Sequence, residues 1–217
     1  MTTKLTTKIM TNALPNSTPD STGYAYSYGD RLPHIRQTLL DLFCTHAYRE
    51  GEFVLSAGKT SSYYINGKLV TLHPQGGRLV GQLLLPLIPP SAVAVAGLTL
   101  GADPIVAAVN VVADYEGRSL TGLIVRKEAK GHGTKLFVEG PTLSSGSSVI
   151  VLEDVVTTGK SAMVAVERLR DMGYHADHVI SLVDRLEGGA EFYQSQNIKF
   201  QAVFTIPEIQ SRWQKLK

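Results

Sequence analysis

The chain has 217 residues, of which 43% are hydrophobic and 18% charged, so it can bury one substantial core. A net charge of +2 excludes a nucleic-acid binder that relies on a large basic field, and no run of 18 apolar residues is present to cross a membrane. Cys44 is the only cysteine and cannot form an internal disulfide. We therefore expect a cytoplasmic protein without membrane or nucleic-acid partners.

The first 29 residues differ in composition from the rest of the chain. Residues 1–29 are rich in Thr, Ser, Asn and Pro and offer few large apolar side chains, which is typical of a flexible tail. Residues 30–217 are then expected to form a single domain. A first helix follows Leu32, because Ile35, Leu39, Phe43 and His46 recur at helical spacing.

Apolar strands and amphipathic helices alternate along the remaining chain. A helix is predicted near 76–88, interrupted by Pro86. Strands are predicted at 92–97, 121–126, 148–153, 178–183 and 199–205, and helices at 104–115, 160–172 and 188–196. This alternation predicts an α/β fold, with a mostly parallel sheet and helices on both faces.

Residues 149–162 (VIVLEDVVTTGKSA) carry the strongest functional signal. The apolar run 149–152 is typical of a central parallel strand, so Glu153 and Asp154 come at its carboxyl end, where α/β sheets bind ligands. The residues that follow supply hydroxyls, a glycine and the first turn of a helix: Thr157, Thr158, Gly159, Lys160 and Ser161. Free N–H groups at such a turn bind phosphate, so the segment is expected to hold a phosphorylated sugar.

Two other interpretations of this segment compete with phosphate binding. The tail Gly159-Lys160-Ser161 resembles the end of a nucleoside-triphosphate P-loop, but that motif needs a glycine where this chain has Asp154. A strand followed by an ordinary capped helix would leave two adjacent acids at a strand end without a role, although burying unpaired charge is costly.

A second segment is basic. Residues 123–135 (LIVRKEAKGHGTK) lead from a short strand into a loop with Arg126, Lys127, Lys130 and His132. A solvated basic loop is the ordinary explanation of such a run. Glycines on both sides of His132, however, suit a flap that excludes water and brings charge to a reacting phosphate.

These segments resemble a known family. Residues 149–162 resemble the 5-phosphoribosyl-1-diphosphate (PRPP) signature of the type I phosphoribosyltransferases, and the R-K-x-x-K-x-H pattern resembles the catalytic loop of the orotate phosphoribosyltransferases. Residues 53–66, 97–104 and 181–185 resemble the family's base-covering hood, its pyrophosphate loop and a strand that ends in a functional arginine. The resemblance implies the type I phosphoribosyltransferase fold with a small N-terminal hood at about 50–70.

The resemblance also implies an activity and a set of site residues. The activity is transfer of the 5-phosphoribosyl group from PRPP to orotate, which forms orotidine 5′-monophosphate and pyrophosphate in pyrimidine biosynthesis. The catalytic residues would be Lys127, Lys130, His132 and Asp154. PRPP would be bound by these four together with Arg126, Glu153, Val155, Val156, Thr157, Thr158, Gly159, Lys160 and Ser161. Orotate would be bound by Thr157, Arg185 and Tyr64.

The resemblance further implies Mg²⁺ as cofactor, held mainly by PRPP and water rather than by protein ligands, and a homodimer with shared active sites. The chain departs from the family at Ser56 and Gly101, where many members carry lysine. Three alternatives remain: a phosphoribosyltransferase for another base, a non-catalytic regulator that binds PRPP, and a structural relic of the fold.

Overall fold

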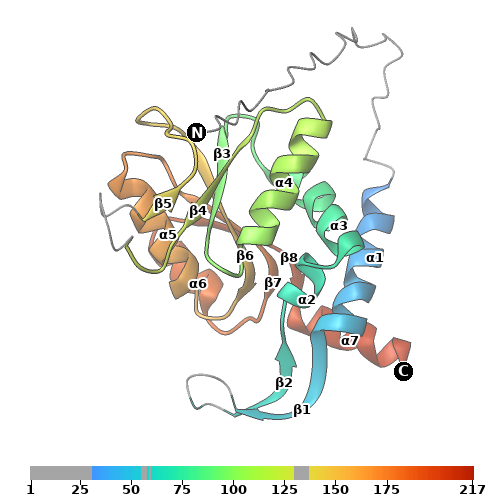
Figure 1. Cartoon of the computed structure of the whole chain (residues 1–217). Coiled ribbons are helices and arrows are strands. Elements are labelled where there is room, and N and C mark those ends of the chain that lie inside the picture. The colour runs from blue at the N-terminus through green and yellow to red at the C-terminus, as the bar shows by residue number, and fades with distance from the viewer. Residues whose placement is uncertain (1–30, 55–57, 59, 130–136) are drawn as a thin grey trace, which may run out of the picture.

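The computed structural model describes residues 31–54, 58, 60–129 and 137–217 (Figure 1). The predicted tail at 1–29, together with Ser56, Lys130 and His132, lies outside the described residues. The central element is a six-stranded sheet with strand order β5-β4-β3-β6-β7-β8. Its strands are β3 (Ala94–Leu98), β4 (Thr121–Val125), β5 (Val138–Glu139), β6 (Val149–Val156), β7 (His178–Asp184) and β8 (Lys199–Thr205). All neighbours pair in parallel except β4 and β5, so the predicted mostly parallel sheet is confirmed.

The sheet is covered on both faces because its central strands are apolar on both sides. In β6, Ile150 and Leu152 pack into one core, whereas Val149 and Val151 pack into the other. Helices α4 (Asp103–Tyr115) and α3 (Pro74–Leu84) lie over the first face, and α5 (Lys160–Asp171) and α6 (Gly189–Ser195) over the second (Figure 1). Two helical layers around one sheet are thereby confirmed.

An N-terminal unit stands beside this sheet. Helix α1 (Leu32–Leu42) continues into a short π-helix, η1 (Phe43–Ala47), and then into an antiparallel hairpin of β1 (Tyr48–Val54) and β2 (Thr60–Ile65). The hairpin corresponds to the predicted hood and projects from the body of the molecule (Figure 1). Helix α2 (Lys68–Thr71) brings the chain back to the sheet, and the short helix η2 (Leu85–Leu87) ends α3 near Pro86.

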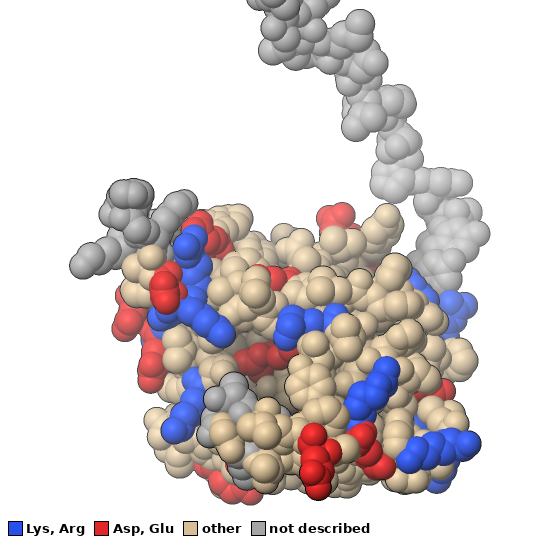
Figure 2. Space-filling view, turned by 60° about the horizontal axis from the view of Figure 1, so that its bottom comes forward, with Lys and Arg blue, Asp and Glu red and all other residues tan. Residues whose placement is uncertain are grey.

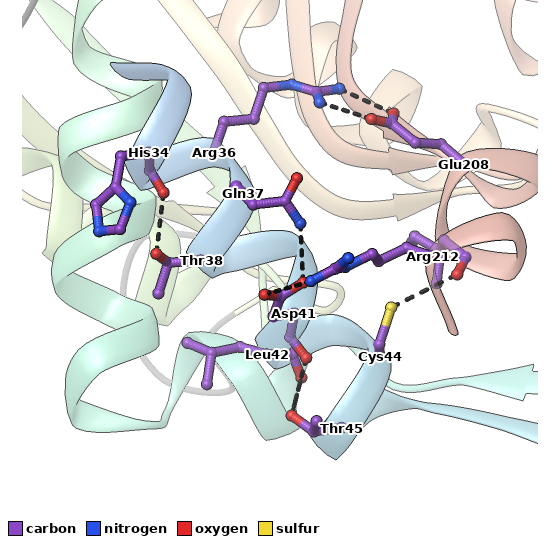
Figure 3. A network of polar contacts seen from close by, with 11 residues as sticks. His34, Arg36, Gln37, Thr38, Asp41, Leu42, Cys44, Thr45, Glu208 and Arg212 are labelled. Carbon is purple, nitrogen blue, oxygen red and sulfur yellow. Dashed lines mark hydrogen bonds and ion pairs between the residues drawn. The ribbon is translucent and has the colours of Figure 1, made fainter. Parts of the chain in front are cut away.

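The C-terminal helix α7 (Ile206–Leu216) was not predicted from the sequence. It packs against α1 and η1, and Figure 3 shows the polar contacts that hold it there. Arg36 on α1 binds both carboxylate oxygens of Glu208 at 2.6 and 2.8 Å, and Arg212 binds both oxygens of Asp41 at 2.6 and 3.0 Å. These paired two-point contacts fix α7 against the N-terminal unit that carries the hairpin.

Two boundaries near the site differ from the prediction. Strand β6 runs to Val156 instead of ending at residue 153, because Val155 and Val156 still pair with Val183 and Asp184 of β7. The helix predicted at 76–88 begins at Pro74 and ends at Leu84. Within the described part of the chain, no helix combines the length and apolar character needed to span a membrane.

Candidate active site

A cleft of about 530 Å³ opens at the carboxyl edge of the sheet. It is lined by Lys68, Leu98, Thr99, Leu100, Gly101, Lys127, Glu153, Asp154, Val155 and Ser161. On the face shown in Figure 2, acidic atoms lie inside a hollow and basic side chains lie along its rim. The cleft therefore brings together the predicted acidic pair, the start of the basic loop and the segment that resembles the pyrophosphate loop.

The two acids at the end of β6 occupy different environments. Glu153 is buried, and its Oε2 has no hydrogen-bond partner among the described residues. Burial, reinforced by the charge of neighbouring Asp154, raises the pKa of the Glu153 carboxyl well above its usual value. Asp154 is only partly buried, and its Oδ1 accepts a hydrogen bond of 2.8 Å from the Val155 N–H. Glu153 therefore holds a proton more readily than an exposed glutamate, and it lies beside Asp154 at the cleft.

Two glycines make room for Asp154. A Cβ atom at Gly101 would lie 2.8 Å from Asp154 Oδ1, and one at Gly67 would lie 3.0 Å from Asp154 Cβ. Any larger residue at position 101 would therefore push the Asp154 carboxylate aside. The family lysine missing at Gly101 cannot be restored here without displacing a predicted catalytic group.

The turn after β6 encloses a second, smaller pocket of about 70 Å³. Its lining includes Glu153, all residues from Val155 to Ala162, and Tyr193. Gly159 has φ +80° at the N-cap of α5, and a Cβ there would approach the rings of Phe192 and Tyr193 to about 3 Å. The chain thus forms the predicted turn at the start of a helix, a geometry that suits a phosphate group.

The basic loop is described only in part. Lys127 lines the larger cleft, and its charge acts on Glu153 against the effect of burial. Arg168 on α5 donates a hydrogen bond of 2.7 Å to the Lys127 carbonyl, which anchors the start of the loop. Arg126 instead pairs with Glu139 at 3.2 Å and is not among the residues lining the cleft. Its predicted contact with PRPP stays a prediction.

Arg185 lies just beyond β7, and its side chain is only 10% exposed. Its Nε donates a hydrogen bond of 2.9 Å to Tyr63 Oη, and its Nη2 pairs with Glu187 at 2.8 Å. The guanidinium also lies 4.9 Å from the centre of the Tyr63 ring. Arg185 is not among the residues lining the cleft or the smaller pocket, so its predicted contact with orotate stays a prediction.

Two adjacent tyrosines of β2 lie on opposite faces of the strand. Tyr64 lies on the exposed face of β2, with its ring 5.6 Å from that of Phe53, whereas Tyr63 contacts Arg185. Side chains alternate along a strand, and the apolar Ile65 already marks the inward face, which Tyr63 shares. Tyr63 is thus the tyrosine that lies beside Arg185, and the contact of Tyr64 with the base stays a prediction.

The described residues contain no group of three or more His, Cys, Asp or Glu side chains that could hold a metal ion. Mg²⁺ commonly keeps several waters and is held by one or two carboxylates together with substrate phosphates. Glu153 and Asp154, at the edge of the cleft, fit that mode of binding.

No protein-family model matches the chain. The orotate phosphoribosyltransferase of Nostoc sp. is 65% identical over 182 residues, which cover 84% of this chain and 88% of that protein. The chain belongs to the orotate phosphoribosyltransferase family. The orotate phosphoribosyltransferase of Synechocystis sp. is 64% identical over 179 residues, covering 82% of this chain and 90% of that protein.

Solved structures of orotate phosphoribosyltransferases share the fold. The Mycobacterium tuberculosis enzyme in complex with inorganic phosphate aligns with a TM-score of 0.70 at 31% identity, and covers 81% of this chain and 98% of that one. The same enzyme in complex with PRPP aligns with a TM-score of 0.67 at 30% identity and the same coverage. The type I phosphoribosyltransferase fold expected from the sequence is confirmed.

Three residues near the site were not found from the sequence. Lys68 lines the cleft, Tyr63 contacts Arg185, and Tyr193 contributes a buried hydroxyl without a partner among the described residues. Strand alternation could have identified Tyr63. Lys68 and Tyr193 reach the site only through the tertiary fold, so no local pattern marks them.

Proposed function

We propose that the cleft at the carboxyl edge of the sheet carries out the reaction of the orotate phosphoribosyltransferase family. In that reaction the 5-phosphoribosyl group passes from PRPP to orotate, giving orotidine 5′-monophosphate and pyrophosphate in pyrimidine biosynthesis. The observation that carries the assignment is that Glu153 lines both the larger cleft, together with Asp154 and Lys127, and the smaller pocket formed by the turn after β6.

The acids act on the sugar. Breaking the anomeric C–O bond builds positive charge on the ribose, as in other displacements with an oxocarbenium-like transition state. Asp154 faces the cleft as a carboxylate that stabilises this charge. Burial raises the pKa of Glu153, and its Oε2, which has no partner among the described residues, binds a ribose hydroxyl.

The two phosphorylated ends of PRPP bind at different places. The 5-phosphate lies in the smaller pocket, where the segment from Thr157 to Ser161 supplies N–H and hydroxyl donors. The diphosphate lies in the larger cleft, where Lys127 offsets the negative charge that builds on the leaving group. Lys130, His132 and Arg126 are proposed to complete this positive field.

Mg²⁺ is the proposed cofactor, bound mainly by diphosphate oxygens and water, with Glu153 and Asp154 at the ribose side. Its chemistry is to neutralise charge on the diphosphate and orient it. The proposed assembly is a homodimer in which part of the basic loop serves the neighbouring site. We further propose that residues 30–217 form one domain after a tail at 1–29, and that the enzyme acts in the cytoplasm.

The substrate assignment predicts that orotate is consumed with PRPP and Mg²⁺, whereas adenine, hypoxanthine and uracil are not. Arg185 is the reason, because a guanidinium selects a base that carries a carboxylate. Loss of orotate absorbance and release of pyrophosphate measure the reaction. Faster turnover of a purine than of orotate would show that the substrate is a purine. PRPP binding without turnover of any base would show that the protein is a regulator.

Arg185→Lys is expected to raise the KM for orotate about tenfold while the KM for PRPP changes less than about twofold. A lysine can keep the ion pair with Glu187, but it loses the Nη1 donor and the hydrogen bond to Tyr63. Steady-state kinetics with each substrate varied in turn measure both constants. Arg36→Lys, which alters a paired arginine on α1 away from the cleft, is the matched control and should change neither KM. An equal rise in both constants would show that Arg185 supports the site as a whole instead of binding orotate.

A further inference from the structure

The geometry points to Lys68 as a diphosphate-binding residue, which takes over the role of the lysine that many family members carry where this chain has Gly101. The inference rests on the proposed function, because the diphosphate of PRPP is the group that Lys68 would hold.

Lys68 is held at the cleft by its backbone. Its N–H donates to Asn66 Oδ1 at 3.3 Å, and the Leu72 N–H returns to its carbonyl at 3.0 Å. The preceding residue, Gly67, packs directly against Asp154. The fold therefore brings this lysine to the same cleft as the catalytic carboxylate, although the two are far apart in sequence.

The ammonium of Lys68 has no ion pair or hydrogen bond with any described residue, and the side chain is half-buried. A lysine side chain loses considerable conformational freedom when it is fixed, so the Lys68 ammonium becomes ordered only when a partner compensates for that loss. Glu153 and Asp154 line the same cleft, but neither lies within ion-pair distance of Lys68. An anionic ligand is the partner that this arrangement lacks.

The position of Lys68 indicates that it binds the diphosphate of PRPP rather than the 5-phosphate. Lys68 lines the larger cleft together with Thr99, Gly101 and Lys127, and it is not part of the lining of the smaller pocket around Thr157 to Ser161. A lysine on residue 101 would have to grow from a Cβ 2.8 Å from Asp154 Oδ1. Lys68 on α2 brings a positive charge to this end of the cleft without that clash.

Binding of two partial ligands tests the assignment in the full-length protein. Pyrophosphate with Mg²⁺ probes the larger cleft, and ribose 5-phosphate probes the smaller pocket. Calorimetric titration of Lys68→Met should show pyrophosphate and PRPP binding weakened about tenfold or more, with ribose 5-phosphate binding within about twofold of the parent protein. Lys68→Arg should keep most of the pyrophosphate affinity, because it retains the charge.

Lys199→Met is the matched control, since Lys199 is an exposed lysine at the amino end of β8, the opposite edge of the sheet. Unchanged pyrophosphate binding by Lys68→Met would overturn the inference, and so would an equal loss of ribose 5-phosphate binding. If Lys68→Met does not fold, Lys68→Gln replaces it, and failure of both to fold would make Lys68 a structural residue. An unaltered protein that binds PRPP but does not convert orotate would refute the proposed function and leave the binding test intact.

Discussion

Glu153→Gln is expected to make the ligand-free protein more stable at about pH 8 and, at the same time, to lower kcat at least about tenfold. Glu153 is buried, and its Oε2 has no partner among the described residues. An unpaired buried polar group costs about 1 to 3 kcal/mol, and more when it is charged. The glutamine side chain has nearly the same shape as that of Glu153 but carries no charge. It cannot make the proposed contact with the ribose hydroxyls in the way that the carboxyl group does.

The gain in stability from Glu153→Gln should increase as pH rises. The pKa of Glu153 is raised in the folded protein, so between its ordinary unfolded value and the raised folded value the folded state binds the additional proton. The free energy of unfolding of the parent protein therefore falls as pH rises through that window, whereas the glutamine variant has no such loss from this position. The difference in melting temperature between the two proteins should be small near about pH 4.5 and grow toward about pH 8.

Glu167→Gln provides the control, because Glu167 is an exposed carboxyl on α5 of the same charge and length. Its melting temperature should follow that of the parent protein at every pH. Melting curves across the pH range, with kcat measured in parallel, separate the two effects. A Glu153→Gln protein that is less stable at about pH 8 would mean that the carboxylate is satisfied in the folded state.

The central sheet could be predicted because its strands are buried on both faces. Runs such as 149–152 and 178–183 contain little besides apolar and β-branched residues, and the helices between them are amphipathic. The location of the acids and of the turn after β6 was predictable for the same reason, since the apolar run 149–152 that precedes them leads to the ligand-binding edge. Their grouping in the structure around two adjoining pockets confirms the predicted location, and their roles stay predictions.

The end of β6 was harder to predict because carboxylates are unfavourable in a sheet interior. Pairing with β7 carries the strand past Glu153 and Asp154 to Val156, a tertiary effect that local sequence does not contain. Helix α7 was missed for a different reason. Ile206, Ile209 and Trp213 follow helical spacing, but the predicted alternation of strands and helices already ends with the strand at 199–205.

Contributions to the site from distant elements could not be read from local patterns. Lys68 lies on a four-residue helix with no repeat of its own, and it reaches the cleft because the fold packs the preceding Gly67 against Asp154. Arg126 shows the opposite case, because the sequence groups it with the basic loop whereas the structure pairs it with Glu139 on β5. Adjacent residues at the end of a strand point in different directions, so Arg126 and Lys127 separate.

If the two subunits share their active sites, two mixtures of inactive variants should behave differently. Asp154→Asn, Lys127→Ala and Lys130→Ala should each be nearly inactive, because each removes charge that acts on the ribose or the leaving group. Lys127 lines the cleft of its own chain, next to Asp154. Mixing Lys127→Ala with Asp154→Asn should therefore restore nothing, since every site in a mixed dimer would still lack one of the two groups.

A mixture of Lys130→Ala with Asp154→Asn should recover activity if Lys130 crosses to the neighbouring site. Random exchange makes about half of all dimers mixed, and each mixed dimer then has one site with both groups intact. The predicted recovery is therefore about one quarter of the parent activity per subunit, measured as orotate consumption after exchange is verified by mass spectrometry of differently tagged chains. Failure of this mixture despite proven exchange would place Lys130 in its own chain's site, and recovery in the Lys127 mixture would move that lysine to the neighbour. Because the two mixtures share the Asp154→Asn chain, a difference between them can come only from which site each lysine serves.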